Sequence, residues 1–387
     1  MRRYCAGAAR FLEAAWDESR ALFSYSTTLV EGDYVQVFSH PSVVRYTVNC
    51  LVGLQKAKQH DTDGDAFIGA TDGLFERFLS VHGAELPSYA DTGLLTVALS
   101  ERGDDAAAVT VRWLAAAIAD GKVERLALQD VSWMLWGLCA AARGGVTGSE
   151  AAARALFRVL HDRFLHRDSL LGRHSANPLR SHVVSFGATV YWLRALYEYA
   201  STFDDEYVDA LFRHGTERIV QIQGPLGQWP WMIAVASAQA IDPYPVFSVH
   251  QDSMSMLFLL PALKRGVDGV DRAIDRSLAW LVGGNELEVD MVVPEPFFVY
   301  RSFERKESLD KARRYARSLW PTAARRPSGY AEAGRLRLNS ECRSYQLGWV
   351  LYAWSGRSDL RDVGALGPGP QRPPPRGPLS EGGDTGS

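Results

Sequence analysis

The segment 223–256 carries the densest group of residues that could bind or transform a small molecule. Gln223, Gly227 and Trp229 form a Q-x3-G-x-W pattern, which is typical of a helix end followed by a glycine turn and an indole. Trp231 follows two residues later, so both indoles can line one face of an extended loop. We therefore expect Trp229 and Trp231 to bind substrate.

The same segment continues with an aromatic residue and a group able to transfer protons. Tyr244 precedes Pro245 in a stretch that we expect to be stiff, because proline restricts its own backbone and the preceding residue. His250, Gln251 and Asp252 follow, at the predicted start of a helix that begins near residue 254. We predict that His250 carries the proton, with Asp252 as its carboxylate partner and with Tyr244 and Gln251 as substrate contacts. A packing role for His250 and a helix N-cap role for Asp252 are the structural alternatives.

Two further groups carry charges in predicted loops. Glu286 and Arg301 follow a helix end, where an exposed loop can aim a carboxylate and a guanidinium at a substrate. Glu341, Arg343 and Tyr345 lie at the start of the last predicted helix. We predict Glu286 as a second catalytic carboxylate and the other four as substrate-binding residues. For Glu341, the alternative is simple stabilisation of the helix N-terminus.

Several well-known motifs are missing from the chain. The sequence has no HExxH, CxxC, GxGxxG, Walker or GxSxG pattern. We therefore expect no bound metal and no cofactor.

The elements that must position these residues are almost all helical. Apolar residues recur three and four apart in ten long stretches, with shorter candidates at 74–81 and 94–99. The long stretches are 8–23, 43–57, 106–118, 131–142, 151–164, 184–200, 207–222, 254–263, 273–282 and 345–354. Alternating runs of strand type occur only at 34–38 and 335–338. The pattern predicts an all-α fold, an α/α toroid of about six helical hairpins, with an open α-solenoid as the alternative.

The connections between these helices are uneven in length. Long ones are expected at 60–73, 172–183, 222–252 and 283–303, and alternate loops of a toroid gather at one mouth. We assign residues 1–360 to a single toroid domain. Residues 361–387 contain six prolines between 368 and 378 and lack an apolar pattern, so we expect a disordered tail.

Composition restricts the class of protein and of partner. The chain has 387 residues, 47% hydrophobic and 22% charged, with a net charge of −3, which argues against a dedicated nucleic-acid binder. The four cysteines are widely spaced and mostly in apolar helical segments, so we expect buried free thiols and a cytoplasmic location. No stretch reaches the roughly 20 apolar residues of a transmembrane helix. A small molecule or an oligosaccharide is the expected partner.

Four sequence blocks support a resemblance to known proteins. The blocks are GQWPW (227–231), YPVFSVHQDSM (244–254), WLVGGNEL (280–287) and ECRSYQLGWVLYAW (341–354). Together they resemble poorly characterised bacterial α/α-toroid proteins associated with polysaccharide biosynthesis, over about residues 41–354. This chain departs from that pattern in the apolar stretch 232–236, where a charged, tyrosine-containing segment is usual, and at Ser253, where glycine is usual.

Two other groups are similar more distantly. Carbohydrate-active α/α toroids, including sugar epimerases, glycoside hydrolases and polysaccharide lyases, stack sugars on Trp and Tyr and transfer protons with His, Tyr, Glu or Arg. This likeness implies an enzyme of glycan metabolism with acid/base chemistry in the toroid mouth. Squalene–hopene-type terpenoid cyclases share the Q-x3-G-x-W element but also carry a DxDD motif that this chain lacks. A cyclase-like enzyme on a polyprenyl substrate, and a non-catalytic binding or scaffold subunit of a biosynthetic complex, are the alternatives.

Overall fold

A computed structural model of the chain describes residues 1–60, 64–177, 181–306 and 329–357. The tail predicted at 361–387 lies outside the described residues, as do parts of the predicted loops 60–73 and 172–183. No helix within the described ranges is long and apolar enough to span a membrane.

Within the described residues, six helices form an outer layer, and each buries one apolar face. In α10 (Glu206–Gln221), Val208, Leu211, Phe212 and Ile219 are buried at the three- and four-residue spacing of one helix face. The Asp205 carboxylate caps this helix by accepting a hydrogen bond from the Val208 amide. The other outer helices are α1 (Arg2–Ala15), α4 (Thr71–His82), α6 (Ala106–Ala119), α8 (Ser149–Phe164) and α12 (Val270–Leu281).

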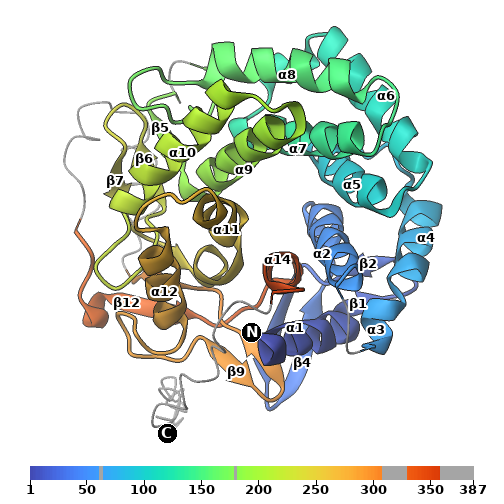
Figure 1. The fold of residues 1–387 in the computed structure, drawn as a ribbon. Coiled ribbons are helices and arrows are strands. Elements are labelled where there is room, and N and C mark those ends of the chain that lie inside the picture. The colour runs from blue at the N-terminus through green and yellow to red at the C-terminus, as the bar shows by residue number, and fades with distance from the viewer. Residues whose placement is uncertain (61–63, 178–180, 307–328, 358–387) are drawn as a thin grey trace, which may run out of the picture.

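Six further helices lie inside this layer and are buried on nearly all sides. In α5, for example, residues 90–99 are all buried. The inner helices are α2 (Val43–Lys58), α5 (Tyr89–Arg102), α7 (Leu128–Arg143), α9 (Phe186–Phe203), α11 (Met256–Lys264) and α14 (Ser344–Trp354). Each packs on the next in chain order, and α14 packs back on α2, which closes the ring (Figure 1). The predicted α/α toroid is confirmed, and the open α-solenoid alternative is wrong.

Two glycines allow this closure. A Cβ atom on Gly53 in α2 would lie 1.9 Å from the carbonyl oxygen of Gly348 in α14. A Cβ on Gly348 would in turn lie 2.6 Å from the Cα of Cys50. The first and last inner helices therefore touch through their backbones, at a distance that only glycine permits.

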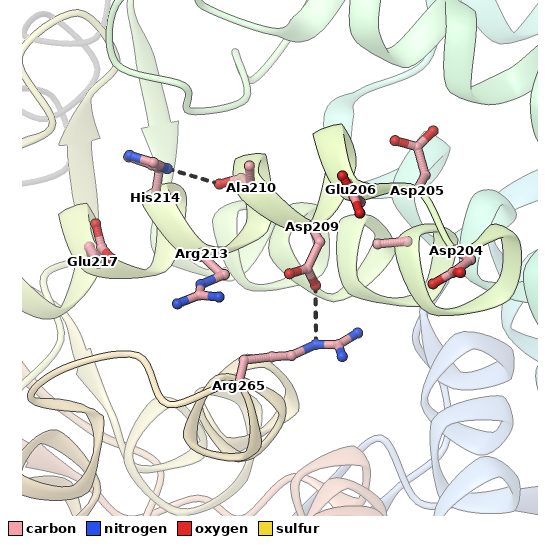
Figure 2. Close-up of a pocket in the computed structure, with 10 residues that line it drawn as sticks. Asp204, Asp205, Glu206, Asp209, Ala210, Arg213, His214, Glu217 and Arg265 are labelled. Carbon is pink, nitrogen blue, oxygen red and sulfur yellow. Dashed lines mark hydrogen bonds and ion pairs between the residues drawn. The ribbon is translucent and has the colours of Figure 1, made fainter.

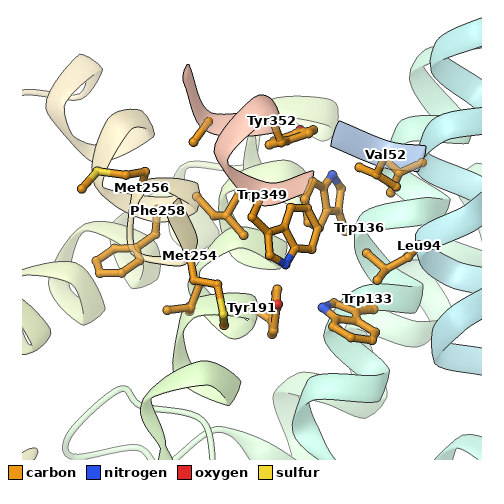
Figure 3. Packing of buried hydrophobic residues seen from close by; sticks show 14 of the residues in the cluster. Val52, Leu94, Trp133, Trp136, Tyr191, Met254, Met256, Phe258, Trp349 and Tyr352 are labelled. Carbon is orange, nitrogen blue, oxygen red and sulfur yellow. The ribbon is translucent and has the colours of Figure 1, made fainter. Parts of the chain in front are cut away.

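Large apolar side chains fill the centre of the ring. Figure 3 shows residues of all six inner helices meeting there, including Val52, Leu94, Tyr191 and Phe258. The Trp136 and Trp349 rings stack with their centroids 5.8 Å apart, and Tyr191 contacts Trp349. The toroid axis is therefore a packed aromatic core.

Short strands occupy the connections between helices. They are β1 (Trp16–Asp17), β2 (Leu22–Phe23), β3 (Ser26–Val30), β4 (Asp33–Val37), β5 (Val183–Ser185), β6 (Met232–Ala234), β7 (Gln239–Asp242), β8 (Val246–Phe247), β9 (Val292–Pro294), β10 (Phe297–Val299), β11 (Ser302–Arg305) and β12 (Leu336–Asn339). The two predicted strands correspond to β4 and β12. The other ten, of two to five residues, are too short to show a clear alternating pattern.

The first predicted helix, 8–23, is displaced from the observed one. The chain is helical over α1, Arg2–Ala15, and then turns back in the antiparallel pair β1–β2, where Trp16 is opposite Phe23. Apolar residues of this hairpin continued the helical spacing in the sequence. The prediction on cysteines is confirmed: all four are free, and Cys50, Cys139 and Cys342 are buried.

Candidate functional site

The long connections gather at one end of the toroid. The inner helices all begin there, and the described parts of segments 16–42, 165–185, 222–249 and 282–343 lie between an outer helix and the following inner helix at that end. We call it the loop end, and we call the opposite end, where the inner helices finish, the turn end. Of the four long loops predicted, 172–183, 222–252 and 283–303 belong to the loop end. The loop 60–73 belongs to the turn end, because it follows the C-terminus of α2.

Three of the predicted charged residues form one cluster at the loop end. Oε2 of Glu341 accepts hydrogen bonds from Nη1 of Arg301, at 3.0 Å, and from Nη2 of Arg343, at 2.7 Å. Arg343 is buried and lies over the Tyr25 ring, whereas the Arg301 side chain remains 26% exposed over Phe247. Two guanidinium groups share one carboxylate, so the cluster keeps one positive charge.

A stack of aromatic rings borders this cluster. Tyr345, which the sequence pointed to, packs on Tyr46 with ring centroids 4.4 Å apart. Tyr46 stacks on Tyr25 at 4.8 Å, and Tyr25 stacks on His40 at 3.6 Å. Burial raises the pKa of both Tyr345 and Tyr46, so these phenols stay neutral. The other three rings of this stack, those of Tyr46, Tyr25 and His40, escaped sequence reasoning, because the segment containing Tyr25 and His40 has no recognisable motif.

His250 lies in an aromatic cage at the same end. A π-helical turn, His250–Met254, leads into α11 and carries the imidazole. Its neighbours are Phe186, Phe247 and Trp231, whose rings lie 4.9, 5.2 and 6.2 Å from the imidazole. Burial lowers the pKa of His250 to about 3, so the ring is neutral near pH 7. Its Nδ1 is buried without a hydrogen-bond partner among the described residues.

The carboxylates predicted as partners of His250 bond elsewhere. Asp252 is completely buried between α1 and α14, where its oxygens accept hydrogen bonds from Tyr4, Gln346 and Ser253. Burial raises the pKa of Asp252 to about 6.

Glu286 belongs to a separate hydrogen-bond network. It accepts bonds from the Tyr244 hydroxyl at 3.1 Å, the Trp280 indole at 2.8 Å and the Gln228 amide at 3.3 Å. Neither Asp252 nor Glu286 hydrogen-bonds to His250, and both networks also tie structural elements together.

The structure separates the aromatic and amide residues that were predicted to bind substrate. Trp231 contacts His250 and is partly exposed, but Trp229 is fully buried, with its indole donating to Ser277 Oγ at 2.9 Å. Tyr244 is also fully buried. Gln251 is buried too, and its amide fits between the Gly227 carbonyl and the Trp229 amide. Of the three aromatic residues among these four, only Trp231 contacts the His250 imidazole, whereas Trp229 stacks on Phe186 with centroids 5.1 Å apart.

An ion-pair group that sequence reasoning missed lies at the beginnings of α2, α5 and α7. Nε of Arg45 donates to the Asp91 carboxylate at 2.6 Å, and its Nη2 lies 3.9 Å from Asp130. The same guanidinium lies over the Trp133 ring at 5.2 Å. Burial raises the pKa of Asp91 in spite of this ion pair.

In the sequence, these two carboxylates look like ordinary helix starts. Asp91 follows Ser88 by three residues and Asp130 lies in the first turn of α7, both common N-terminal patterns. Only the packing of α2, α5 and α7 in the folded ring shows that Asp91 and Asp130 share Arg45.

Two cavities lie away from the loop end. A cavity of about 780 Å³ opens at the turn end. A smaller one, of about 440 Å³, lies on the outer surface beside α10, where Asp209 pairs with Arg265 at 3.1 Å and further acidic side chains of α10 and the turn before it line the cavity (Figure 2). Within the described ranges, no group of three or more His, Cys, Asp or Glu side chains is arranged to hold a metal ion.

Comparisons with known proteins bear on the fold alone. No family model matches the sequence, and no curated protein matches it. Among solved structures, cellobiose 2-epimerase from Bacillus thermoamylovorans B4167 matches with a TM-score of 0.62 and 11% identity, over 89% of this chain and 94% of that one.

Two hydrolases match similarly. An inactive variant of the α-1,6-mannanase GH76A of Salegentibacter sp. HEL1_6, in complex with α-1,6-mannotriose, has a TM-score of 0.57 and 10% identity, over 91% of this chain and 98% of that one. An unsaturated glucuronyl hydrolase specific for heparin has a TM-score of 0.55 and 11% identity, over 90% and 94%. The chain therefore shares the α/α-toroid fold of these carbohydrate-active enzymes.

Proposed function

We propose that the protein is a carbohydrate-active enzyme that binds its substrate at the loop end of the toroid. The observation that carries this proposal is the gathering of aromatic and charged side chains where the inner helices begin. Aromatic rings offer flat apolar faces for stacking, and charged groups beside them fix orientation and transfer protons. The matched epimerase and hydrolases, which share the fold, support a sugar as the substrate class.

The binding roles follow from exposure and charge. Trp231 and Tyr345 form the stacking wall, and Tyr46 extends it. Arg301 and Arg343 hold an acidic group of the sugar, because Glu341 neutralises only one of their two charges. A uronic acid or another acidic glycan unit is therefore the favoured substrate.

Proton transfer is assigned to His250 and Asp91. The neutral imidazole is assigned as the proton acceptor, and Asp91, whose pKa is raised above its usual value by burial, as the proton donor. Epimerisation, elimination and glycoside hydrolysis each require a proton acceptor and a proton donor. The matched mannanase variant, whose two replaced residues are aspartates, is described as inactive, which supports carboxylate chemistry on this fold. For Asp252 and Glu286 we now propose supporting roles.

A screen for turnover tests these assignments. The panel contains reducing disaccharides, α-1,6-mannosides and unsaturated uronide disaccharides, assayed for epimerised, eliminated and hydrolysed products. We expect His250→Ala and Asp91→Asn each to lower kcat/KM by at least about 100-fold, the usual contribution of a positioned proton carrier. His214→Ala and Asp275→Asn, at exposed positions on α10 and α12, are the matched controls and should keep full activity.

Two outcomes would contradict the proposal. If both site variants turned over an identified sugar at the wild-type rate, the proton-transfer assignment would be wrong. If no sugar bound at all, the non-catalytic scaffold subunit of a biosynthetic complex would become the better account. A polyprenyl substrate is less well supported, because it needs a large apolar cavity and Trp136, Trp349 and Tyr191 fill the toroid axis. A cytoplasmic location, which suits the free thiols, remains part of the proposal.

A further inference from the structure

The cavity at the turn end, here called the rear cavity, has the size and lining of a binding site. Its volume of about 780 Å³ is within the range of pockets that enclose small organic molecules. Every inner helix, or the turn directly after it, contributes to its lining. The aromatic core of Trp136, Trp349 and Tyr191 lies on the toroid axis between this cavity and the loop end, so the two sites are separate compartments.

Positive charge dominates the rear cavity. Its described lining contains five cationic side chains and two carboxylates, an excess of three positive charges. The cations are Lys56, Arg143, Arg194, Lys264 and Arg357, and the carboxylates are Glu101 and Glu198. Cations at the last turn of a helix are common because they complement the helix dipole, and Lys56, Arg143 and Lys264 occupy such positions. Charge at the helix ends alone is therefore no evidence of a ligand.

At the floor of the cavity, positive charge also lies away from the helix ends. Arg194 lies in the middle of α9, where it donates to the Leu257 carbonyl at 3.1 Å and to the Tyr352 hydroxyl at 2.7 Å. Glu198, which is buried, pairs with both Arg194 and Arg143. The two arginines thus pair with one carboxylate and together keep one positive charge, with the Arg194 side chain 12% exposed and that of Arg143 40% exposed.

Two other groups lack partners within the described residues. The Lys264 side chain is exposed and its ammonium forms no hydrogen bond or ion pair there, whereas Oε2 of Glu101 is buried without a hydrogen-bond partner. Apolar side chains of α11, including Leu257, Leu260 and Pro261, line the cavity beside them. A ligand with an acidic group, hydroxyls and an apolar face would pair with Lys264, hydrogen-bond to Glu101 and pack on the side chains of α11.

We infer that the rear cavity binds a small organic anion, a sugar phosphate or a sugar carboxylate, at a site distinct from the loop end. The acidic group pairs with Lys264 and the Arg143–Arg194 pair, a ligand hydroxyl hydrogen-bonds to Glu101, and the ring packs on the α11 side chains. This site is independent of the proposed catalytic function, since none of its residues belongs to the loop end.

Calorimetric titration of the full chain with glucose 6-phosphate, glucuronate and glucose tests the inference. We expect at least one of the two anions to bind, with the tighter one identifying the acidic group, and glucose to bind at least about tenfold more weakly. Lys264→Gln should weaken anion binding about tenfold, because it removes an unpaired cation without breaking an existing contact. Lys122→Gln, at an exposed lysine in the connection before α7, should retain the wild-type affinity. Arg301→Gln, which removes a cation of the loop end, separates binding at the rear cavity from binding at the loop end.

Three results would overturn the inference: no binding of either anion, equally tight binding of glucose, or an unchanged anion affinity in Lys264→Gln. Loss of anion binding in Arg301→Gln but not in Lys264→Gln would place the anion at the loop end instead. Thermal melting of each variant checks that the chain is folded before its affinity is compared.

Discussion

His250 and Asp252 lie two residues apart in the π-helical turn, and burial drives both toward their neutral forms. The pKa of His250 is lowered to about 3 and that of Asp252 is raised to about 6. Both shifts make folding stability depend on pH, with opposite signs. Over the pH range between its two pKa values, His250 releases a proton on folding, whereas Asp252 takes one up. The two contributions can be separated by replacing one residue at a time.

For His250, we predict loss of stability in acid. Between pH 6.5 and about 3 the unfolded imidazole binds a proton that the folded one does not, so the free energy of unfolding falls as pH falls. The slope approaches about 1.4 kcal/mol per pH unit for this one group. Chemical denaturation of the wild type and of His250→Gln at pH 7, 6 and 5 measures it. An equal pH dependence in both proteins would show that His250 is not buried in its neutral form.

For Asp252, the sign is reversed. Between pH 3.8 and about 6 the folded carboxyl keeps a proton that the unfolded one loses, so its contribution to stability is present at low pH and lost as pH rises. Asparagine can replace it, with the amide donating to Ser253 while its oxygen accepts from Tyr4 and Gln346. We expect Asp252→Asn to gain about 2–3 kcal/mol relative to wild type between pH 4 and pH 7. A constant difference across that range would contradict this account of Asp252.

At the residue scale, the sequence was most informative where polar residues follow a helix end or begin a helix. Arg301, Glu341 and Arg343 were predicted from such positions, and they form one cluster. Arg45 and Asp91 were not predicted, because an arginine within a helix and an aspartate after a cap have ordinary local explanations. Their pairing depends on the contact between α2 and α5, which no local pattern reports.

At the scale of elements, the helices were predictable because each buries a regular apolar face. The strands and the helix contacts were harder, since a two-residue strand carries no period and the π-helical turn differs from an α-helix only in its hydrogen bonds. The glycines of the inner helices show the same limit. Gly53 and Gly348 look unfavourable within helices, yet they permit α2 and α14 to touch.

We therefore predict that Gly53→Ala destabilises the protein by about 2–4 kcal/mol, since its new methyl group would overlap the Gly348 carbonyl and force α2 from α14. Gly73→Ala is the matched control. It lies in α4 with no atom within 4 Å of its added Cβ, so it should stabilise the helix slightly, by about 0.5–1 kcal/mol. Urea denaturation measures both variants. Equal stability of Gly53→Ala and wild type would contradict the close contact that closes the ring.

At the scale of the whole molecule, the toroid separates two chemically different ends. The aromatic core along the axis divides them, the long connections collect at the loop end, and the short turns leave the rear cavity at the other. A count of about six helical hairpins was enough to predict a ring. The position of α14 against α2, some 300 residues away in the chain, could not be predicted, because it depends on backbone contact between distant segments.

Sugar binding at the loop end is the central property to test. The most direct measurement is calorimetric titration of the wild type, Trp231→Ala and Arg301→Gln with cellobiose, α-1,6-mannotriose and a heparin-derived uronide disaccharide. We predict that the uronide binds, that Trp231→Ala and Arg301→Gln each weaken it about tenfold or more, and that Trp113→Ala on α6 leaves it unchanged. Binding that is equally tight in all four proteins, or no binding of any of the three sugars, would contradict the central claim.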